Sequence, residues 1–173
     1  MLLACSADTS PPAETPEDTA ATDTGTPPNR WLAVSAGGDH SCGLTADGEA
    51  LCWGSDEYGQ SSPPAANFVD VRASEHHTCG LTTDGEALCW GIDDASGLDY
   101  GQVSLAPTSE RFSTLSAGHM HSCGLTEAST LLCWRDKYGP PAGEYQSVTV
   151  GNPASCATDT AGAVHCWGPV YHD

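Results

Sequence analysis

Apolar and polar positions alternate in short runs along this chain, and the clearest run occurs four times. It spans residues 40–54 and returns at residues 77–91, 121–135 and, less faithfully, 154–168. In each copy nine residues separate two cysteines, and a tryptophan follows the second cysteine. Alternation with a period of two is typical of β-strands, so the pattern predicts four copies of one β-unit.

The first copy predicts a β-hairpin with a three-residue loop. Asp47-Gly48 is a strong turn signal, because glycine adopts a positive φ without a steric penalty. A loop over residues 46–48 places Cys42 opposite Cys52 in a non-hydrogen-bonded pair, where Cα atoms lie about 4.5 Å apart, within reach of a disulfide. The sequence therefore predicts four disulfides: Cys42–Cys52, Cys79–Cys89, Cys123–Cys133 and Cys156–Cys166.

Both faces of the predicted hairpin are apolar. One face carries Cys42 and Leu44, and the other carries Leu51 and Trp53. Sheets that are covered on both sides have this pattern, and four small sheets stacked face to face form propeller blades or a solenoid. The third copy has Ser129 at the glycine position of the turn, so we expect a strained or different turn there.

Four units follow the N-terminal segment, and none of them carries helix signals. Each unit opens with an aromatic residue and a short β-like run, at Trp31, Phe68, Phe112 and Tyr145. We therefore expect an all-β protein. Its predicted parts are a disordered segment over residues 1–30 and a repeat domain over residues 31–173, with units over 31–67, 68–111, 112–144 and 145–173.

Four sequence elements follow one another in the first unit. They are Gly-x-x-His-Ser (residues 37–41), a leucine-led Asp-Gly turn (44–48), Trp-Gly (53–54) and Gly-Gln (59–60). This order resembles the repeat of the regulator of chromosome condensation family in its bacterial form. The resemblance covers about residues 31–168. It implies a β-propeller of four-stranded blades, usually seven in number.

The third and fourth units depart from this pattern. Arg135 stands where a glycine follows the other tryptophans, and Ala154 replaces the histidine of the fourth unit. Thr158 and His165 occupy positions that are leucine in the other units, as expected for the more polar face at the end of an open array. Because four units cannot complete a ring of seven, we expect an open or partial propeller. Such a chain could self-associate or be a fragment.

The charge balance excludes two classes of partner. The chain has 5 Lys plus Arg against 23 Asp plus Glu, a formal net charge of −18. Such a surface repels phosphate backbones and anionic membranes, so we expect no nucleic-acid partner. Eight of the nine cysteines stand in evenly spaced pairs, which favours an oxidising compartment. We expect a bacterial cell-envelope or extracellular location.

Cys5 is the unpaired cysteine and has its own interpretation. Residues 2–5, Leu-Leu-Ala-Cys, resemble the lipobox of bacterial lipoproteins, whose cysteine is lipidated after the signal peptide is removed. Residues 6–30 are rich in Thr, Pro, Ala and acidic residues, which is typical of a disordered tether. The basic part and most of the apolar part of a signal peptide are missing before Cys5. Lipid anchoring, the expected membrane contact, therefore requires a start codon upstream of Met1.

For the histidines that precede cysteines and for the acidic segment from Asp93 to Asp99, we favour a structural role over metal binding. His40, His77 and His121 precede cysteines, and Cys with His can bind zinc, but the nine-residue spacing exceeds that of zinc fingers. The resemblance implies that these histidines pack between blades. The acidic segment from Asp93 to Asp99 fits no recognisable calcium loop, which leaves calcium there as an open alternative. No nucleophile elbow or phosphate loop is present. We expect no enzyme activity, metal or cofactor.

The connections that follow each tryptophan vary most between units, and loops on a rigid scaffold usually carry recognition. We therefore expect a non-enzymatic, secreted or surface-bound scaffold that binds a protein, still unidentified, through these connections. The alternative is a glycan- or wall-binding module that uses Tyr58, Tyr100 and Tyr138. Each of these tyrosines stands directly before a glycine of its connection, so we expect all three on one rim.

Overall fold

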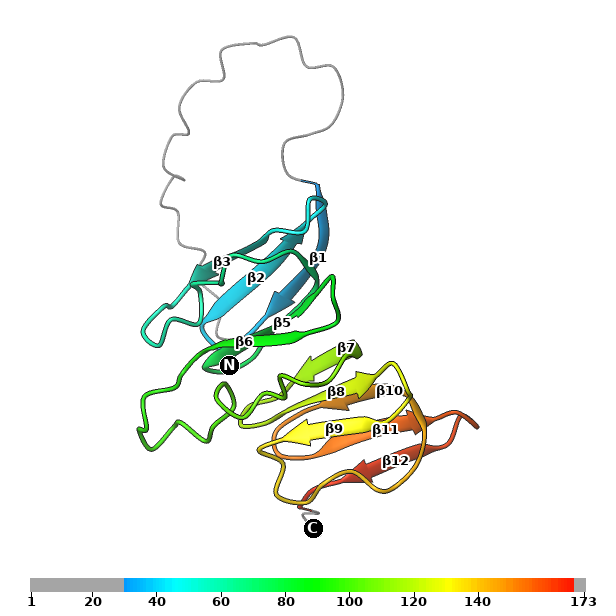
Figure 1. Cartoon of the computed structure of the whole chain (residues 1–173). Coiled ribbons are helices and arrows are strands. Elements are labelled where there is room, and N and C mark those ends of the chain that lie inside the picture. The colour runs from blue at the N-terminus through cyan, green and yellow to red at the C-terminus, as the bar shows by residue number, and fades with distance from the viewer. Residues whose placement is uncertain (1–29, 170–173) are drawn as a thin grey trace, which may run out of the picture.

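The computed structural model describes residues 30–169, which form twelve β-strands in four antiparallel sheets of three strands each (Figure 1). Within this part of the chain there is no helix, and therefore none that could cross a bilayer. We refer to the sheets as blades 1 to 4. Cys5 and the rest of the N-terminal segment up to residue 29 lie outside the described residues.

The strands of each blade follow one another in chain order. Blade 1 contains β1 (Trp31–Ala36), β2 (His40–Thr45) and β3 (Ala50–Gly54); blade 2 contains β4 (Phe68–Ala73), β5 (His77–Thr82) and β6 (Ala87–Gly91). Blade 3 contains β7 (Phe112–Ala117), β8 (Ser122–Thr126) and β9 (Leu131–Trp134); blade 4 contains β10 (Tyr145–Val150), β11 (Ser155–Asp159) and β12 (Val164–Trp167). The resemblance implies four strands per blade, whereas each described blade has three.

Each blade has the hairpin register that the sequence predicts. In blade 1, Cys42 lies opposite Cys52, and the other three blades repeat this pairing. All four predicted disulfides are present, each with a Cα–Cα distance of 4.0 Å. Each bond fastens the middle strand of a blade to its outer strand.

The turn of blade 3 is strained rather than different. The Ser129 N–H donates to the Thr126 carbonyl at 2.9 Å, as Gly48 donates to Thr45 at 3.0 Å. Ser129 has a φ of 61°, a left-handed conformation that serine adopts less readily than glycine.

An aromatic ring lies over the central glycine of the middle strand in the first three blades. A Cβ on Gly80 would come within 2.4 Å of the Phe68 ring, and Gly43 and Gly124 have the same relation to Trp31 and Phe112. A larger residue at these positions would displace the ring. In these three blades the opening aromatic residue therefore needs this glycine.

Consecutive blades pack through matched apolar faces. The leading face of each blade carries the opening aromatic residue, and it covers the trailing face of the blade before, which carries a disulfide and apolar residues of the middle and outer strands. At the first junction Phe68 and Val71 cover Cys42 and Leu44, and the other two junctions repeat this arrangement. Each junction thus buries one small hydrophobic core.

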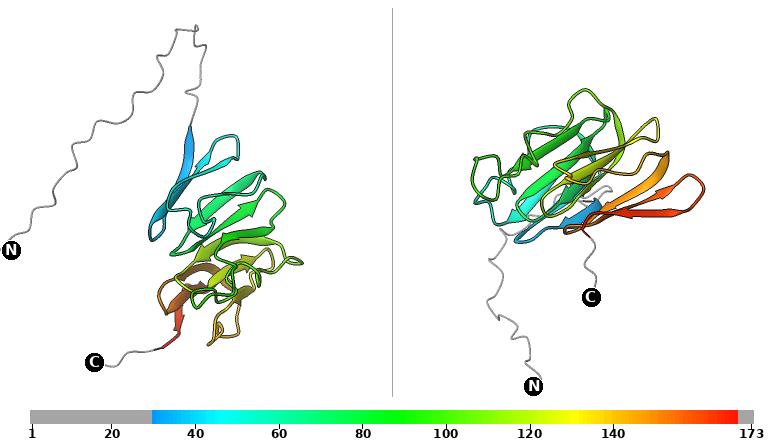
Figure 2. Two further views of the ribbon diagram at one scale, coloured as in Figure 1. Left: turned by 90° about the vertical axis from the view of Figure 1, so that its left-hand side faces the viewer. Right: turned by 90° about the horizontal axis from the view of Figure 1, so that it is seen from below.

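The four blades form an open arc, with blade 1 and blade 4 at its two ends (Figures 1 and 2). The innermost strands β1, β4, β7 and β10 contact one another in turn, and extended contacts join only consecutive blades. The predicted open or partial propeller of all-β blades is therefore confirmed.

Thr158 and His165, the two polar residues at leucine positions of blade 4, do not lie on the same face of the blade. This corrects the expectation that both belong to the end face of the array. His165 occupies the position of Leu88 and Leu132, which pack into the junction with the preceding blade. Accordingly, His165 lies edge-on to Tyr145 with ring centroids 5.9 Å apart, away from the free end of the arc. Of the two residues, Thr158 alone belongs to the trailing end face.

Candidate protein-binding site

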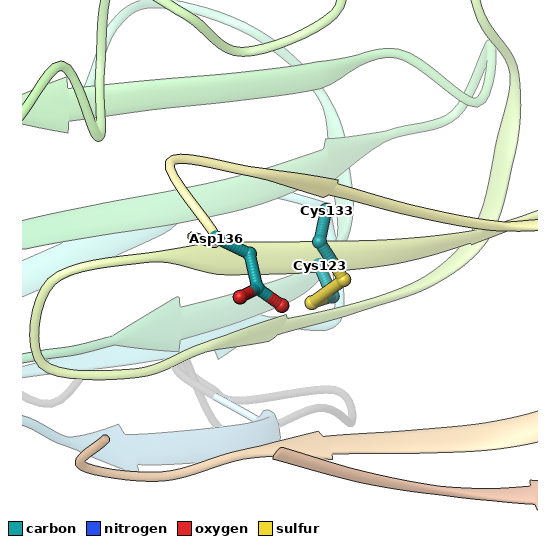
Figure 3. Close-up of side chains that lie close together, drawn as sticks. All are labelled: Cys123, Cys133 and Asp136. Carbon is teal, nitrogen blue, oxygen red and sulfur yellow. A yellow bond between two sulfur atoms is a disulfide. The ribbon is translucent and has the colours of Figure 1, made fainter. Parts of the chain in front are cut away.

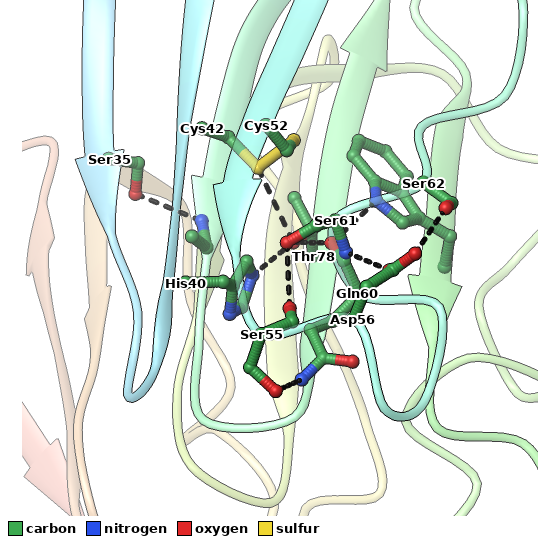
Figure 4. The surroundings of a disulfide bond; sticks show 12 residues. Ser35, His40, Cys42, Cys52, Ser55, Asp56, Gln60, Ser61, Ser62 and Thr78 are labelled. Atoms are coloured by element: carbon green, nitrogen blue, oxygen red, sulfur yellow. Dashed lines mark hydrogen bonds between the residues drawn. A yellow bond between two sulfur atoms is a disulfide. The ribbon is translucent and has the colours of Figure 1, made fainter. Parts of the chain in front are cut away.

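Three buried histidines link each blade to the next. In blade 1, Nε2 of His40 lies 2.7 Å from Oγ1 of Thr78 in blade 2 (Figure 4). His77 and His121 make the corresponding contacts with Ser122 and Ser155. Burial lowers the pKa of all three histidines, that of His77 to about 3. These residues are therefore neutral hydrogen-bonding links between blades at physiological pH.

One group of potential metal ligands lies in blade 3, where ligand atoms of Cys123, Cys133 and Asp136 come within 4.8 Å of one another (Figure 3). The two cysteines form a disulfide, so they offer no thiolate, which is the form of cysteine that binds metal. The Asp136 carboxylate accepts a hydrogen bond from the Trp167 indole. These contacts give the group a structural role in the junction with blade 4.

The segment from Asp93 to Asp99, for which calcium binding is an open alternative, uses the carboxylates of Asp94 and Asp99 for hydrogen bonds within its own loop. Asp99 accepts hydrogen bonds from the amides of Ala95 and Gly101, each at 2.8 Å. Asp94 accepts one from Ser96 at 2.9 Å, and hydrogen bonding by Ser96 lowers the pKa of Asp94. The carboxylates therefore shape this connection.

The Gly-Gln element explains how two connections are held on the scaffold. The backbone carbonyl of Gln60 accepts a hydrogen bond from the Trp90 indole at 2.9 Å, and that of Gln102 accepts one from Trp134 at 3.0 Å. Each connection is therefore fastened to the outer tryptophan of the following blade. The third connection lacks Gly-Gln, and Asp136 takes over this role through its side chain.

The three candidate rim tyrosines occupy equivalent positions in their connections, but each ring has a different partner. Tyr58 lies edge-on to His76, with ring centroids 5.2 Å apart. The Tyr100 ring faces the guanidinium of Arg135 at 5.9 Å, and the Tyr138 ring faces Nζ of Lys137 at 5.6 Å. Tyr100 and Tyr138 therefore belong to one group of side chains, whereas Tyr58 belongs to another.

Two hollows flank the segment from Arg135 to Lys137. The first has a volume of about 540 Å³ and is also lined by Tyr100, Leu105 and Met120. The second has a volume of about 550 Å³, and its additional lining residues are His121, Tyr138, Asn152, Pro153 and Pro169, with Met120 shared between the two hollows. We call this region the Arg135 groove. It joins the connection that follows blade 2 with residues of blades 3 and 4 and of the connection between them.

Sequence reasoning missed the basic members of this site. Arg135 was noted only as a departure from the repeat, and Lys137 was given no role. A signal was present, because the chain has only 5 Lys plus Arg and two of them stand within three residues. Tyr100 and Leu105 could not be assigned to the same site, because they are 30 or more residues away in sequence.

A protein-family comparison accounts for the repeats. The model of the regulator of chromosome condensation (RCC1) repeat matches residues 31–60 and 68–102, which are blades 1 and 2, each with the first part of the connection after it. Blades 1 and 2 therefore match RCC1 repeats. Blades 3 and 4 have the same strand order and hairpin register as the two matched RCC1 blades. No curated protein sequence matches the chain significantly.

Solved propellers of this type superimpose on most of the described arc. The ectodomain of the Physcomitrella patens receptor kinase CR4 has a TM-score of 0.68 and 27% identity, covering 80% of this chain and 39% of that one. The CRINKLY WD40 ectodomain of the Arabidopsis thaliana receptor kinase ACR4 has a TM-score of 0.67 and 25% identity, covering 82% of this chain and 51% of that one. Prp20p from Saccharomyces cerevisiae has a TM-score of 0.66 and 16% identity, covering 84% of this chain and 47% of that one.

These comparisons also show how much of the solved structures the chain spans, and they bear on its cellular location. The chain spans only 39% to 51% of the length of these solved structures. Two of them are receptor ectodomains, and disulfides persist in oxidising compartments. Together with the four disulfides, this indicates an extracellular or secreted protein.

Proposed function

We propose that the chain is a non-enzymatic, surface-exposed scaffold that binds another protein at the Arg135 groove. The observation that supports this most is the contrast between repeated blades and divergent connections. The blades share one register and one disulfide position, whereas the connections differ in length and bring Tyr100, Arg135 and Lys137 together beside a hollow. Tyrosine and arginine are enriched among residues that dominate protein interfaces.

The N-terminal segment supplies the proposed mode of attachment. The lipobox-like residues 2–5 support lipidation of Cys5 in a bacterial envelope, with residues 6–30 as the tether. Labelling with a radioactive fatty acid in a bacterial host, from a gene that includes any upstream leader, tests this proposal. Incorporation that Cys5→Ser abolishes would support it, and unlabelled wild-type protein would refute it.

Affinity capture from secreted proteins, with wall polysaccharide in a parallel experiment, tests the binding function. We expect the wild-type chain to retain a defined protein, and the double variant Tyr100→Ala/Tyr138→Ala to lose it. Asp47→Asn, in the hairpin turn of blade 1 and outside the groove, is the matched control and should retain it. If the polysaccharide binds and the tyrosine variant releases it, the glycan-binding alternative replaces this proposal.

A further inference from the structure

Arg135 and Lys137 differ from Arg72 and Arg111 in their partners. Arg72 pairs with Asp70 at 2.8 Å and Arg111 with Glu86 at 3.1 Å. Within residues 30–169, Arg135 and Lys137 form no ion pair, although the chain carries 23 Asp plus Glu. Both are exposed, and both stand over tyrosine rings. Their charges are therefore available to a ligand.

The backbone at Arg135 shows a second unusual feature. The equivalent residues in blades 1, 2 and 4 are Gly54, Gly91 and Gly168, with φ values of 105°, 116° and 122°. Arg135 has a φ of 64°, a left-handed conformation that is unfavourable for a residue with a Cβ. Strain of this kind concentrates at functional sites. Among the described residues, Ala95, Ser129 and Arg135 are the non-glycine residues with a positive φ, and Arg135 is the one that places a guanidinium beside the two hollows.

The walls of the Arg135 groove specify the rest of the ligand. Leu105, Met120 and Pro153 contribute apolar surface on the two sides of the basic segment. Methionine adapts its shape to different partners and is common at binding surfaces. Two hollows of about 540 and 550 Å³ have the volume of small-ligand sites. The groove therefore suits apolar side chains next to an anionic group.

The net charge of the chain limits how acidic the ligand can be. At −18, a partner with many carboxylates would be repelled at long range, whereas a single carboxylate gains from both local cations. Resting on the proposed function, we infer that the Arg135 groove binds a short partner segment with one carboxylate flanked by apolar side chains. The carboxylate is either an Asp or Glu side chain or the C-terminus of the partner.

Selection of random heptapeptides displayed at a free C-terminus, with the full chain as bait, tests this inference. We expect the enriched peptides to place a carboxylate, from one acidic side chain or from the C-terminus, beside Leu, Met or aromatic residues. Synthetic versions then separate the two sources of the carboxylate. Changing Glu to Gln tests the side chain, and amidation tests the C-terminus. The responsible change should weaken binding roughly tenfold or more, as expected for a charge-assisted hydrogen bond.

Arg135→Gly is the decisive variant, because it restores the glycine of the repeat and removes the backbone strain. We expect its melting temperature to equal or exceed that of the wild type, while peptide affinity falls at least tenfold. Arg111→Gln, which removes the same charge from the ion pair with Glu86, is the matched control and should bind as the wild type does.

Three outcomes would overturn the inference: unchanged affinity in Arg135→Gly, no enrichment, or binding that survives both the loss of the acidic side chain and amidation of the C-terminus. The proposed function is distinguished by the captured protein. If the wild type and Arg135→Gly retain that protein equally well while Tyr100→Ala/Tyr138→Ala loses it, the scaffold function stands and the carboxylate ligand does not.

Discussion

The leading faces of blade 1 and blade 2 have the same pattern but opposite surroundings. Phe68 and Val71 of blade 2 are 2% and 1% exposed, whereas Trp31 and Val34, at the equivalent positions of blade 1, are 42% and 71% exposed. The residues are similar in kind, so the difference arises from the neighbour. Blade 2 lies against the trailing face of blade 1, and no described blade lies before blade 1. An apolar residue of this repeat is core only where a neighbouring blade covers it.

The other end of the arc shows the same effect on a trailing face. Cys42, Cys79 and Cys123 are fully buried under the next blade, whereas Cys156 of blade 4 is half-buried and its partner Cys166 is exposed. Blade 4 also lacks the histidine link, because Ala154 stands at that position. Internal junctions and end faces should therefore respond differently to the same perturbation.

The largest contrast should come from truncating the opening aromatic residue. Phe112→Ala removes a ring from the buried core between blades 2 and 3, which typically costs about 3–5 kcal/mol. Trp31→Ala removes a half-exposed ring and should cost about 1–2 kcal/mol, since less apolar area is lost. Urea unfolding followed by far-ultraviolet circular dichroism measures both. Equal losses would show that the leading face of blade 1 is covered in solution.

Acid should weaken the internal junctions through the histidine links. Burial lowers the pKa of His77 from 6.5 to about 3, so between these values the unfolded chain takes up a proton that the folded chain does not. Stability should be highest above pH 6.5 and decline as the pH falls towards 3. Thermal unfolding between these pH values should show a shallower decline in His77→Asn. A variant that declines as steeply as the wild type would assign the acid sensitivity to other groups.

Reduction should distinguish the disulfides by their exposure. Thiol exchange requires access to a sulfur atom, and Cys166 is the exposed end of the blade 4 bond. Cys156–Cys166 should therefore open first under a mild reductant, ahead of the three bonds that each contain a fully buried cysteine. Alkylation with time, followed by peptide mass analysis, measures the order. Simultaneous labelling of all four pairs would indicate global unfolding instead.

The smallest effect should come from restoring the leucine of the repeat at the free end. Thr158→Leu should change the free energy of unfolding by less than about 0.5 kcal/mol, because no described blade covers that position. The reverse change inside the arc, Leu125→Thr, buries a hydroxyl in a core and should cost about 2–3 kcal/mol. A strongly stabilised or concentration-dependent Thr158→Leu variant would show that the end face associates with another copy.

The local features of the fold could be predicted because their causes are local. Residues 46–48 specify the turn, and period-two alternation then brings Cys42 opposite Cys52. The same reasoning held at Ser129, where the turn is kept and the backbone is strained. Repetition of the pattern four times predicted stacked sheets, and the resemblance to a family of usually seven blades added the open or partial propeller.

The sequence alone thus determined the repeat, the hairpin register and the disulfides, because each depends on residues within about a dozen positions of one another. Only the tertiary structure decided which apolar faces are buried, on which side His165 lies, and that Tyr100, Met120 and Arg135 meet beside one groove. The physical reason is that these features depend on contacts between blades. Such contacts join residues far apart in the chain, and no local pattern encodes them.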